Sequence, residues 1–536
     1  MSVWRPHDTA TPPRLLDPAP GRVTHITLAG RAEWSTPCVG ATAFWTPDSD
    51  RPRWLPPSWS KPTTVSLSKG APVAALVGTG DTNLCAVAVD EGVASVLLSG
   101  GVVEETGEFA WWVEAEGPVT LRIDRRPVPF ARALADVAAW WGKDEHHRVP
   151  ATAWLPVYCT WYALHQSVTA EAVERQAALA AALGCATLIV DDGWQTTDDS
   201  RGYGTCGDWR STFPDMADHV RRVHDLGLAY VLWYALPFLG RRADAWPALA
   251  HAVARDVPHL DAGVLDPRLP EARAHLVDRL SAAVAEWGVD GLKVDFVDTF
   301  GAELSDGLLV LLRELDARLR AHRPDVLVEH RQNYVSPALW PYATMVRAAD
   351  CPLSPTENRQ RIVDLRLVSG PLPVHGDPLM WHPAEPPEGV AAMLIGNLFG
   401  VPQISVDLER LTAGQSATVA FWLGVIREHG PVLHRAELTP SRPELGYPQI
   451  SASDGATTIV GRYAPLPVRV PSGRLLVANA DPDEWVLLTG EPGRLLIRVR
   501  DCRGRAVDGP ARVDLDGHVP VRVPLGGLLE VTRVGR

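Results

Sequence analysis

The stretch Thr169–Asp192, TAEAVERQAALAAALGCATLIVDD, changes from one periodicity to another at Gly184. Before the glycine, small and apolar residues recur at helical spacing, and the glycine stands where a left-handed C-terminal cap is expected. After it, the short apolar run Thr187–Val190 is typical of a buried strand. Asp191 and Asp192 end that strand. The stretch therefore predicts a helix followed by a buried strand that carries carboxylates at its C-terminal end.

The same alternation of strand and helix extends in both directions. The predicted strands are Trp154–Cys159, Thr187–Asp191, Tyr230–Tyr234, Gly291–Phe296, Val326–His330, Thr344–Arg347, Leu372–Val374 and Gln403–Val406. Helices are expected over Thr169–Leu183, Met216–Leu226, Leu276–Trp287 and Leu308–Leu319. Eight such units predict a parallel (β/α)8 TIM barrel. A doubly wound sheet is the rival fold, and it is disfavoured because no GxGxxG follows the first strand.

The flanking regions read as β-rich, so the whole chain is predicted to be a multidomain α/β protein. Short apolar runs such as Val73–Val77 and Val93–Leu98 alternate with turn residues, and Gly100-Gly101 is predicted to form a hairpin turn. The predicted parts are an N-terminal β-sandwich-like domain over residues 1–128, a linker helix within 129–150, the barrel over 151–434 and a C-terminal β-sandwich over 435–536.

Composition restricts the partners and the compartment. With 51 Lys+Arg against 64 Asp+Glu, the net charge of −13 disfavours nucleic acid and membrane surfaces as partners. Seven scattered cysteines without a CxxC pair indicate neither a disulfide framework nor a zinc site. We expect a cytoplasmic protein, since no signal-like or membrane-spanning stretch is found. The 20 tryptophans are compatible with sugar binding, although large packed cores and interdomain contacts are the commoner reason for such a content.

Two strand ends carry residues suited to acid–base chemistry. In Gly291–Phe296, Lys293 and Asp295 share one face, so both are expected to point into the barrel mouth. A lysine one pleat below Asp295 would lower the pKa of that carboxyl, as the nucleophile of a retaining glycosidase requires. An interior ion pair is the alternative. Asp350, between Ala349 and Cys351, is expected to have a raised pKa and to serve as general acid, or else to begin a helix.

Further polar and aromatic residues follow other predicted strands. Predicted substrate contacts at these positions are Glu329, Arg331, Arg347 and Asp377. Tryptophans on the predicted mouth loops, suited to stacking on a sugar ring, are Trp194, Trp209, Trp233 and Trp381.

Four motifs in order resemble clan D glycoside hydrolases, and most of all family 36, the α-galactosidases and raffinose synthases. They are Asp191–Gln195, Gly207-Asp208-Trp209, Val231-Leu232-Trp233 and Lys293-Val294-Asp295. The resemblance covers about residues 150–410. It implies a retaining mechanism on α-galactosides, or more generally on a glycoside or oligosaccharide, without cofactor or metal.

The resemblance also assigns roles to individual residues. It implies that Asp295 is the nucleophile and Asp350 the acid/base. It places Asp191 and Asp192 on the galactose 4- and 6-hydroxyls. It further implies that Lys293 contacts sugar hydroxyls and that Trp209 lines the pocket. Hydrolysis and transglycosylation both remain open.

The sequence departs from the family pattern at three places. Val297 replaces the asparagine found two residues after the nucleophile, so a contact near the sugar 2-position is expected to be missing. Glu329–Asn333 replaces a Cys- and Gly-rich segment, and Glu329 and Arg331 are the candidates to bind that hydroxyl instead. The N-terminal domain is short for the family. A β-L-arabinopyranoside, an α-N-acetylgalactosaminide or an α-glucoside therefore stay as alternative substrates.

Two other classes of function are alternatives. A metal-dependent barrel hydrolase would use histidines at strand ends, and the candidates are His219, His224, His330 and His375. It is disfavoured because the first predicted strand ends without a histidine pair. A catalytically inactive sugar-binding barrel is disfavoured because both key carboxylates are present. The sequence leaves the oligomeric state unspecified.

Overall fold

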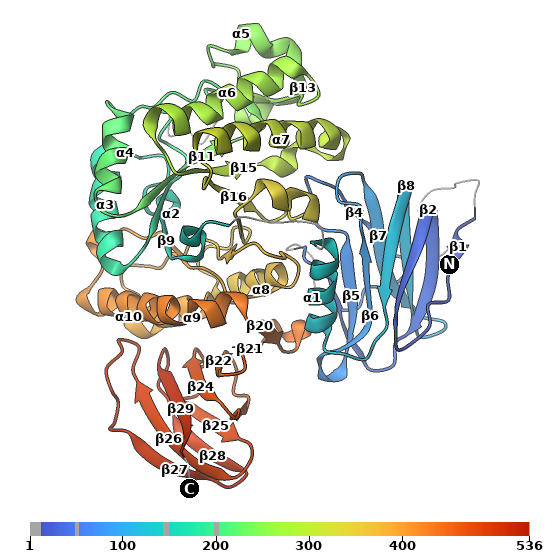
Figure 1. Cartoon of the computed structure of the whole chain (residues 1–536), viewed down its shortest axis with the longest axis vertical. Helices are drawn as coiled ribbons and strands as arrows, with labels where there is room; N and C mark the ends of the chain where they lie inside the picture. The colour runs from blue at the N-terminus through green and yellow to red at the C-terminus, as the bar shows by residue number, and fades with distance from the viewer. Residues whose placement is uncertain (1–11, 49–52, 143–148, 198–202, 535–536) are drawn as a thin grey trace.

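The computed structural model describes residues 12–48, 53–142, 149–197 and 203–534. Its centre is a parallel barrel in which every predicted strand is found (Figure 1). The strands are β9 (Val157–Cys159), β10 (Thr187–Val190), β11 (Ala229–Ala235), β15 (Gly291–Asp295), β16 (Leu327–Arg331), β17 (Met345–Arg347), β18 (Val374–His375) and β19 (Gln403–Ile404). Their order is β18-β17-β16-β15-β11-β10-β9-β19, and the bridge His375↔Val401 brings the two ends together. This nearly closed, eight-stranded parallel barrel is consistent with the predicted TIM barrel.

Helices surround this barrel (Figure 1). They are α3 (Ala170–Leu183), α4 (Met216–His224), α6 (Pro270–Trp287), α7 (Ser305–His322), α8 (Pro355–Arg366), α9 (Pro387–Gly396) and α10 (Ala413–Gly430). Helix α3 ends at the expected cap, where Gly184 adopts φ +102°, and Thr169 caps its N-terminus by accepting from the Ala172 amide. A side chain at that φ would be strained, which explains the glycine. Between β11 and β15 the chain inserts α5 (Trp246–Leu249) and a small sheet of β12 (Phe238–Gly240), β13 (Val253–Val257) and β14 (Ala262–Leu265).

The N-terminal strands form one eight-stranded sheet. They are β1 (Arg14–Leu15), β2 (Val23–Pro37), β3 (Ala41–Trp45), β4 (Thr63–Val65), β5 (Val73–Gly78), β6 (Thr82–Val89), β7 (Val96–Val103) and β8 (Glu108–Asp124). The short helix α1 (Phe130–Trp141) then leads to the barrel, along the side of this sheet (Figure 1). That the region is sandwich-like stays a prediction.

The predicted hairpin at Gly100-Gly101 is wrong. Both glycines lie inside β7, where they pair with Trp111 and Ala110 of β8. A Cβ on Gly100 would lie 2.2 Å from the Phe109 ring, and one on Gly101 would lie 2.4 Å from the Pro57 carbonyl oxygen. Glycine is required there for close packing, not for a turn.

The C-terminal strands form a seven-stranded and a three-stranded sheet. They are β20 (Glu437–Pro440), β21 (Gln449–Ser453), β22 (Thr457–Arg462), β23 (Val468–Arg469), β24 (Arg474–Asn479), β25 (Trp485–Thr489), β26 (Gly493–Arg500), β27 (Ala511–Leu515), β28 (His518–Arg522) and β29 (Leu528–Val534). A buried aliphatic cluster that includes Val477, Leu488 and Leu529 draws on both sheets. This is compatible with the predicted sandwich. None of the described helices is long and apolar enough to cross a bilayer.

Candidate active site

The C-terminal end of β15 places Asp295 at the barrel mouth, where three groups contact its carboxylate. The Trp233 indole donates to Oδ2 at 3.0 Å, and the Phe296 amide donates to Oδ1 at 2.8 Å. The Arg331 guanidinium pairs with Oδ1 at 3.1 Å. Burial by itself would raise the pKa of Asp295, but Arg331 and then Lys293 outweigh it and lower the pKa. The carboxylate is therefore ionised and held in one orientation.

Lys293 does not form its ion pair with Asp295, which corrects the expected pairing. Its ammonium group contacts Oδ2 of Asp191, the residue that directly follows β10, at 2.5 Å. Only 5% of either side chain is exposed. The two-residue period of the strand correctly predicted that Lys293 points into the barrel. It carries no information about which carboxylate lies opposite. Lys293 lowers the pKa of Asp295 from a distance, after the larger effect of Arg331.

Asp350 lies in the segment that follows β17, with 53% of its side chain exposed. Arg347 Nη1 contacts Oδ1 at 2.9 Å, and Arg331 Nη1 lies 3.8 Å from Oδ2. Asp350 does not begin a helix, because α8 starts at Pro355 and is capped by Ser354.

The expectation that the pKa of Asp350 is raised is wrong. Burial favours the neutral acid, but Arg347 and Arg331 favour the carboxylate more strongly and lower the pKa to about 2. The sequence neighbours Ala349 and Cys351 suggested a weakly polar setting. Arg331 comes from the neighbouring strand β16, which the local sequence cannot show, and the side chain of Arg347, three residues before Asp350, turns back to that carboxyl.

Arg331 is the residue that brings the two predicted catalytic carboxylates together. One guanidinium contacts Asp295 through Nε and faces Asp350 through Nη1. Its third carboxylate neighbour, Asp298, lies 3.7 Å away. Asp295 and Asp350 are thus separated by little more than one guanidinium group, at the same mouth of the barrel.

Asp192 is a second buried carboxylate at the mouth, beside Asp191. Gln166 and Gln195 each donate to it at 2.6 Å. Burial, with a further effect of Asp191, raises the pKa of Asp192 to about 6. Sequence reasoning quoted Gln195 in a motif but gave neither glutamine a role. Gln166 follows β9 in a loop, and no periodic pattern distinguishes it.

The predicted mouth tryptophans have different environments. Trp209 is 4% exposed, and its indole nitrogen has no hydrogen-bond partner among the described residues, so it can donate to a ligand. Trp233 already donates to Asp295. Trp194 is fully buried and donates to the Trp233 carbonyl, so it supports the mouth from behind. Trp381 is 5% exposed, and its indole nitrogen also has no partner.

Arg347 lies between two further carboxylates of the site. It contacts Asp377 at 2.5 Å and lies 3.6 Å from Glu329. Asp377 also accepts from the Tyr162 hydroxyl at 3.0 Å, and burial raises its pKa to about 6. Glu329 is 1% exposed and accepts from Gln403 at 2.5 Å. Tyr162 and Gln403 are contributors that sequence reasoning missed, because neither ends a polar motif.

The four histidines that are candidate metal ligands have separate surroundings. His219 contacts Glu174 and Tyr230, His224 contacts Asp290, and His375 contacts the Ala153 carbonyl. Among the described residues, no group of three or more His, Cys, Asp or Glu side chains is arranged to hold a metal ion.

Comparison with known proteins identifies the fold. No family model matches the sequence. A stretch of 206 residues is 23% identical to the bifunctional α-galactosidase/sucrose kinase AgaSK of Mediterraneibacter gnavus, which covers 34% of this chain and 22% of that protein. The match thus spans about a fifth of that curated relative.

Solved structures match over nearly the whole chain. The galactosidase domain of AgaSK superposes with a TM-score of 0.66 at 13% identity, covering 96% of this chain and 78% of that one. The Lactobacillus brevis α-galactosidase gives 0.66 at 13%, over 96% and 75% of the two chains. The family 36 α-galactosidase AgaA of Geobacillus stearothermophilus, bound to 1-deoxygalactonojirimycin, gives 0.64 at 14%, over 94% and 76%. The chain therefore has the fold of the glycoside hydrolase family 36 α-galactosidases.

Proposed function

We propose that this protein is a retaining glycoside hydrolase that acts on α-galactosides. The observation that carries the proposal is the convergence of Asp295 and Asp350 on the Arg331 guanidinium at the barrel mouth. Two closely placed carboxylates, one of them ionised and oriented, are what a double displacement at an anomeric carbon requires. The fold shared with α-galactosidases supports the sugar assignment.

In the proposed first step, Asp295 attacks the anomeric carbon while Asp350 protonates the departing glycosidic oxygen. The Trp233 and Phe296 donors keep the attacking carboxylate in place. Asp350 must carry a proton in this step. We infer that a bound sugar separates Asp350 from Arg331 and excludes water, and both changes raise the pKa of that carboxyl. In the second step Asp350 acts as base and activates water, or an acceptor hydroxyl, to release the sugar.

Selectivity would come from Asp191, Asp192 and Lys293, with Trp209 as an additional donor. Buried polar groups that lose their partners are costly, so a sugar without the matching hydroxyls is rejected. Structures with this fold have been solved with raffinose and stachyose for AgaA variants. Oligosaccharides that end in an α-galactosyl group are therefore the first natural substrates to test.

The first prediction concerns the nucleophile. Asp295→Ala is expected to lower kcat on 4-nitrophenyl α-galactoside by at least about 10⁴-fold, because the covalent step is lost. Azide is expected to restore part of the activity and to give the β-galactosyl azide, which NMR identifies. Asp266→Ala, which removes a buried aspartate of the inserted region, is the matched control. An Asp295→Ala enzyme of normal activity would refute the assignment.

The sugar itself is tested with a panel of nitrophenyl glycosides. The α-galactoside is expected to give the largest kcat/KM, ahead of the β-L-arabinopyranoside, which lacks only the hydroxymethyl group. The α-N-acetylgalactosaminide and the α-glucoside complete the panel. A larger value for any of these three would replace the proposed sugar and leave the mechanism in place. Product analysis with an oligosaccharide acceptor separates hydrolysis from transglycosylation.

A further inference from the structure

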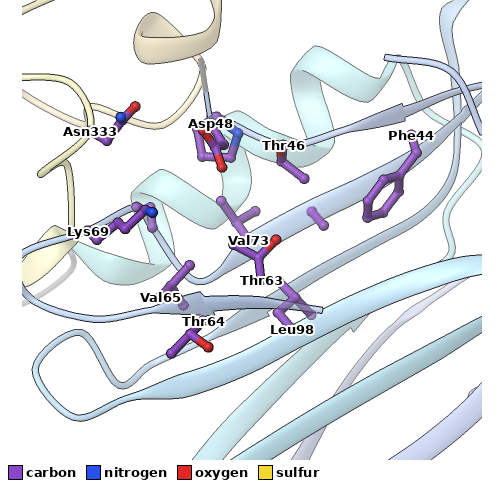
Figure 2. Close-up of a pocket in the computed structure, with 14 residues that line it drawn as sticks. Phe44, Thr46, Asp48, Thr63, Thr64, Val65, Lys69, Val73, Leu98 and Asn333 are labelled. Carbon is purple, nitrogen blue, oxygen red and sulfur yellow. The ribbon is translucent and has the colours of Figure 1, made fainter. Parts of the chain in front are cut away.

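The segment that follows β16 lies against the N-terminal sheet, as Figure 2 shows around Asn333, Asp48 and Lys69. Hydrogen bonds of Gln332 and Asn333 cross this boundary. The Gln332 side-chain amide donates to the Pro47 carbonyl at 2.8 Å, and the Gly70 amide donates to the Asn333 carbonyl at 2.5 Å. A pocket in the N-terminal region is lined by Val65, Val73 and Leu98 among others, and Asn333 reaches it from the barrel side (Figure 2). The N-terminal sheet therefore packs directly on the residues next to Arg331.

Gln332 also contacts the segment that carries Asp350. Its side-chain carbonyl accepts from the Ala349 backbone amide at 3.2 Å, and its backbone amide donates to the Arg347 carbonyl at 2.9 Å. The residue is 1% exposed. One buried side chain thus connects the Pro47 carbonyl of the N-terminal region to the residue that precedes the proposed acid/base.

The other contacts of this segment come from within the barrel. Arg361 donates to the Ala349 and Asp350 carbonyls at 3.0 and 2.6 Å, and Asp377 accepts from the Cys351 amide at 2.8 Å. Because about half of the Asp350 side chain is exposed, its position depends on the backbone that carries it. A displacement of about 1 Å in a catalytic group can cost about 10²-fold in rate.

We propose that Gln332 is a positioning residue, through which the N-terminal sheet holds the backbone of Ala349 and Asp350 in place for proton transfer. The proposal rests on the proposed function, and specifically on Asp350 as acid/base. It assigns the N-terminal region a part in catalysis that does not involve contact with the sugar. The amide of Gln332 does this with both ends: its NH2 group binds Pro47, and its oxygen binds Ala349.

The test uses Gln332→Met in the full chain, because methionine has a similar shape and lacks both hydrogen bonds. The measured quantity is kcat/KM for a series of α-galactosides, from melibiose to the 2,4-dinitrophenyl glycoside. The control is Gln176→Met. Gln176 is equally buried and bridges Tyr158, Asp407 and Leu408, outside the proposed active site.

Proton donation matters for a poor leaving group and hardly at all for a good one. Gln332→Met is therefore expected to lower kcat/KM by about 10- to 100-fold for melibiose and by less than about 3-fold for the dinitrophenyl glycoside. The Gln176→Met variant is expected to change both values equally. An equal loss on both substrates in Gln332→Met, or no loss, would overturn the proposal.

A second readout follows the backbone directly. Hydrogen–deuterium exchange over residues 345–354 is expected to be faster in Gln332→Met than in wild type, and unchanged in Gln176→Met. If Gln332→Met does not fold, Gln332→Asn, which is too short to bridge both partners, takes its place. Unchanged exchange in a folded Gln332 variant would also overturn the proposal.

Failure of the underlying function gives a different result. Asp350→Ala is expected to show a loss that is steep for melibiose and slight for the dinitrophenyl glycoside. If Asp350→Ala cleaves melibiose as well as wild type does, Asp350 is not the acid and the proposed mechanism falls. If only Gln332→Met behaves like wild type, the mechanism stands and the role of Gln332 is refuted.

Discussion

At the scale of the residue, neighbouring charges decide the protonation state of the two proposed catalytic carboxylates. Burial favours the neutral form of both Asp295 and Asp350, yet both have lowered pKa values. Arg331 contributes to both, because its guanidinium lies between them. The same arginine that stabilises the nucleophile as an anion therefore opposes the protonated state that Asp350 needs in the first step. We expect the pH dependence of kcat/KM to show the effect of Arg331 on Asp350.

Arg331→Gln is expected to raise the pKa of Asp350, because the ionised carboxyl loses one of its two nearby cations. The first step needs protonated Asp350, so the high-pH limb of the kcat/KM profile is expected to move to higher pH. Arg331→Lys keeps the charge and is the control, with a limb closer to that of wild type. A limb at the same pH in wild type and Arg331→Gln would contradict this account.

At the scale of the element, β16 shows how one strand serves two environments. Glu329 and Arg331 point into the barrel, while His330 points outward into an apolar region lined by Tyr334, Leu339 and Trp340. His330 is 2% exposed, and neither ring nitrogen has a hydrogen-bond partner among the described residues. Burial lowers the pKa of His330 to about 4, so the imidazole is neutral in the folded protein at neutral pH.

His330→Leu is expected to raise the free energy of unfolding by about 1–2 kcal/mol, because an unpartnered buried polar group is removed. The unfolded chain takes up the histidine proton below its ordinary pKa of about 6.5, whereas the folded chain does so only near 4. The wild type therefore loses stability as pH falls through this window, and the gain from leucine is expected to be larger at pH 5 than at pH 8.

Urea unfolding at the two pH values measures this effect. His518→Leu, at an exposed position of β28, is the control and is expected to change little. A His330→Leu variant that is less stable than wild type at both pH values would contradict this account.

At the scale of the whole molecule, Asp364 of α8 joins three regions of the chain. Its carboxylate accepts from the Trp45 indole at 3.0 Å and from the Tyr447 hydroxyl at 2.6 Å, and it pairs with Arg53. Trp45 and Arg53 belong to the N-terminal region, and Tyr447 precedes β21 in the C-terminal region. The Asp364 side chain is 1% exposed. This junction and the Gln332 contact both fix the N-terminal sheet to the barrel.

Asp364→Ala is expected to lower the free energy of unfolding by about 3–5 kcal/mol, because Arg53 is left without its partner in a buried site. Differential scanning calorimetry is expected to show a lower and broader transition, as the three regions lose their common contact. Asp244→Ala removes an exposed partner of Arg210 and is expected to cost about 1 kcal/mol or less. Equal effects of the two variants would show that the Asp364 junction is not stabilising.

Prediction from sequence succeeded where the signal was local. Most barrel strands lie in short apolar runs, several of them beside an amphipathic helix, and the cap at Gly184 depends on a single residue. Prediction failed at Gly100-Gly101, where the reason for glycine is contact with Phe109 and Pro57. It also failed for the partner of Lys293 and the pKa of Asp350. Asp191 and Arg331 reach those groups from elsewhere in the barrel, and Arg347, three residues before Asp350, turns its side chain back to that carboxyl.

The amino-acid sequence by itself determined the barrel, its strand order along the chain and the inward direction of Lys293 and Asp295. These follow from periodicities of about 2 and 3.6 residues, which short-range sterics and burial impose. The tertiary structure alone decided which charges face one another and that Gln332 links the N-terminal sheet to Asp350. Electrostatic and hydrogen-bond partners depend on distances between strands and between domains, and no local pattern encodes those distances.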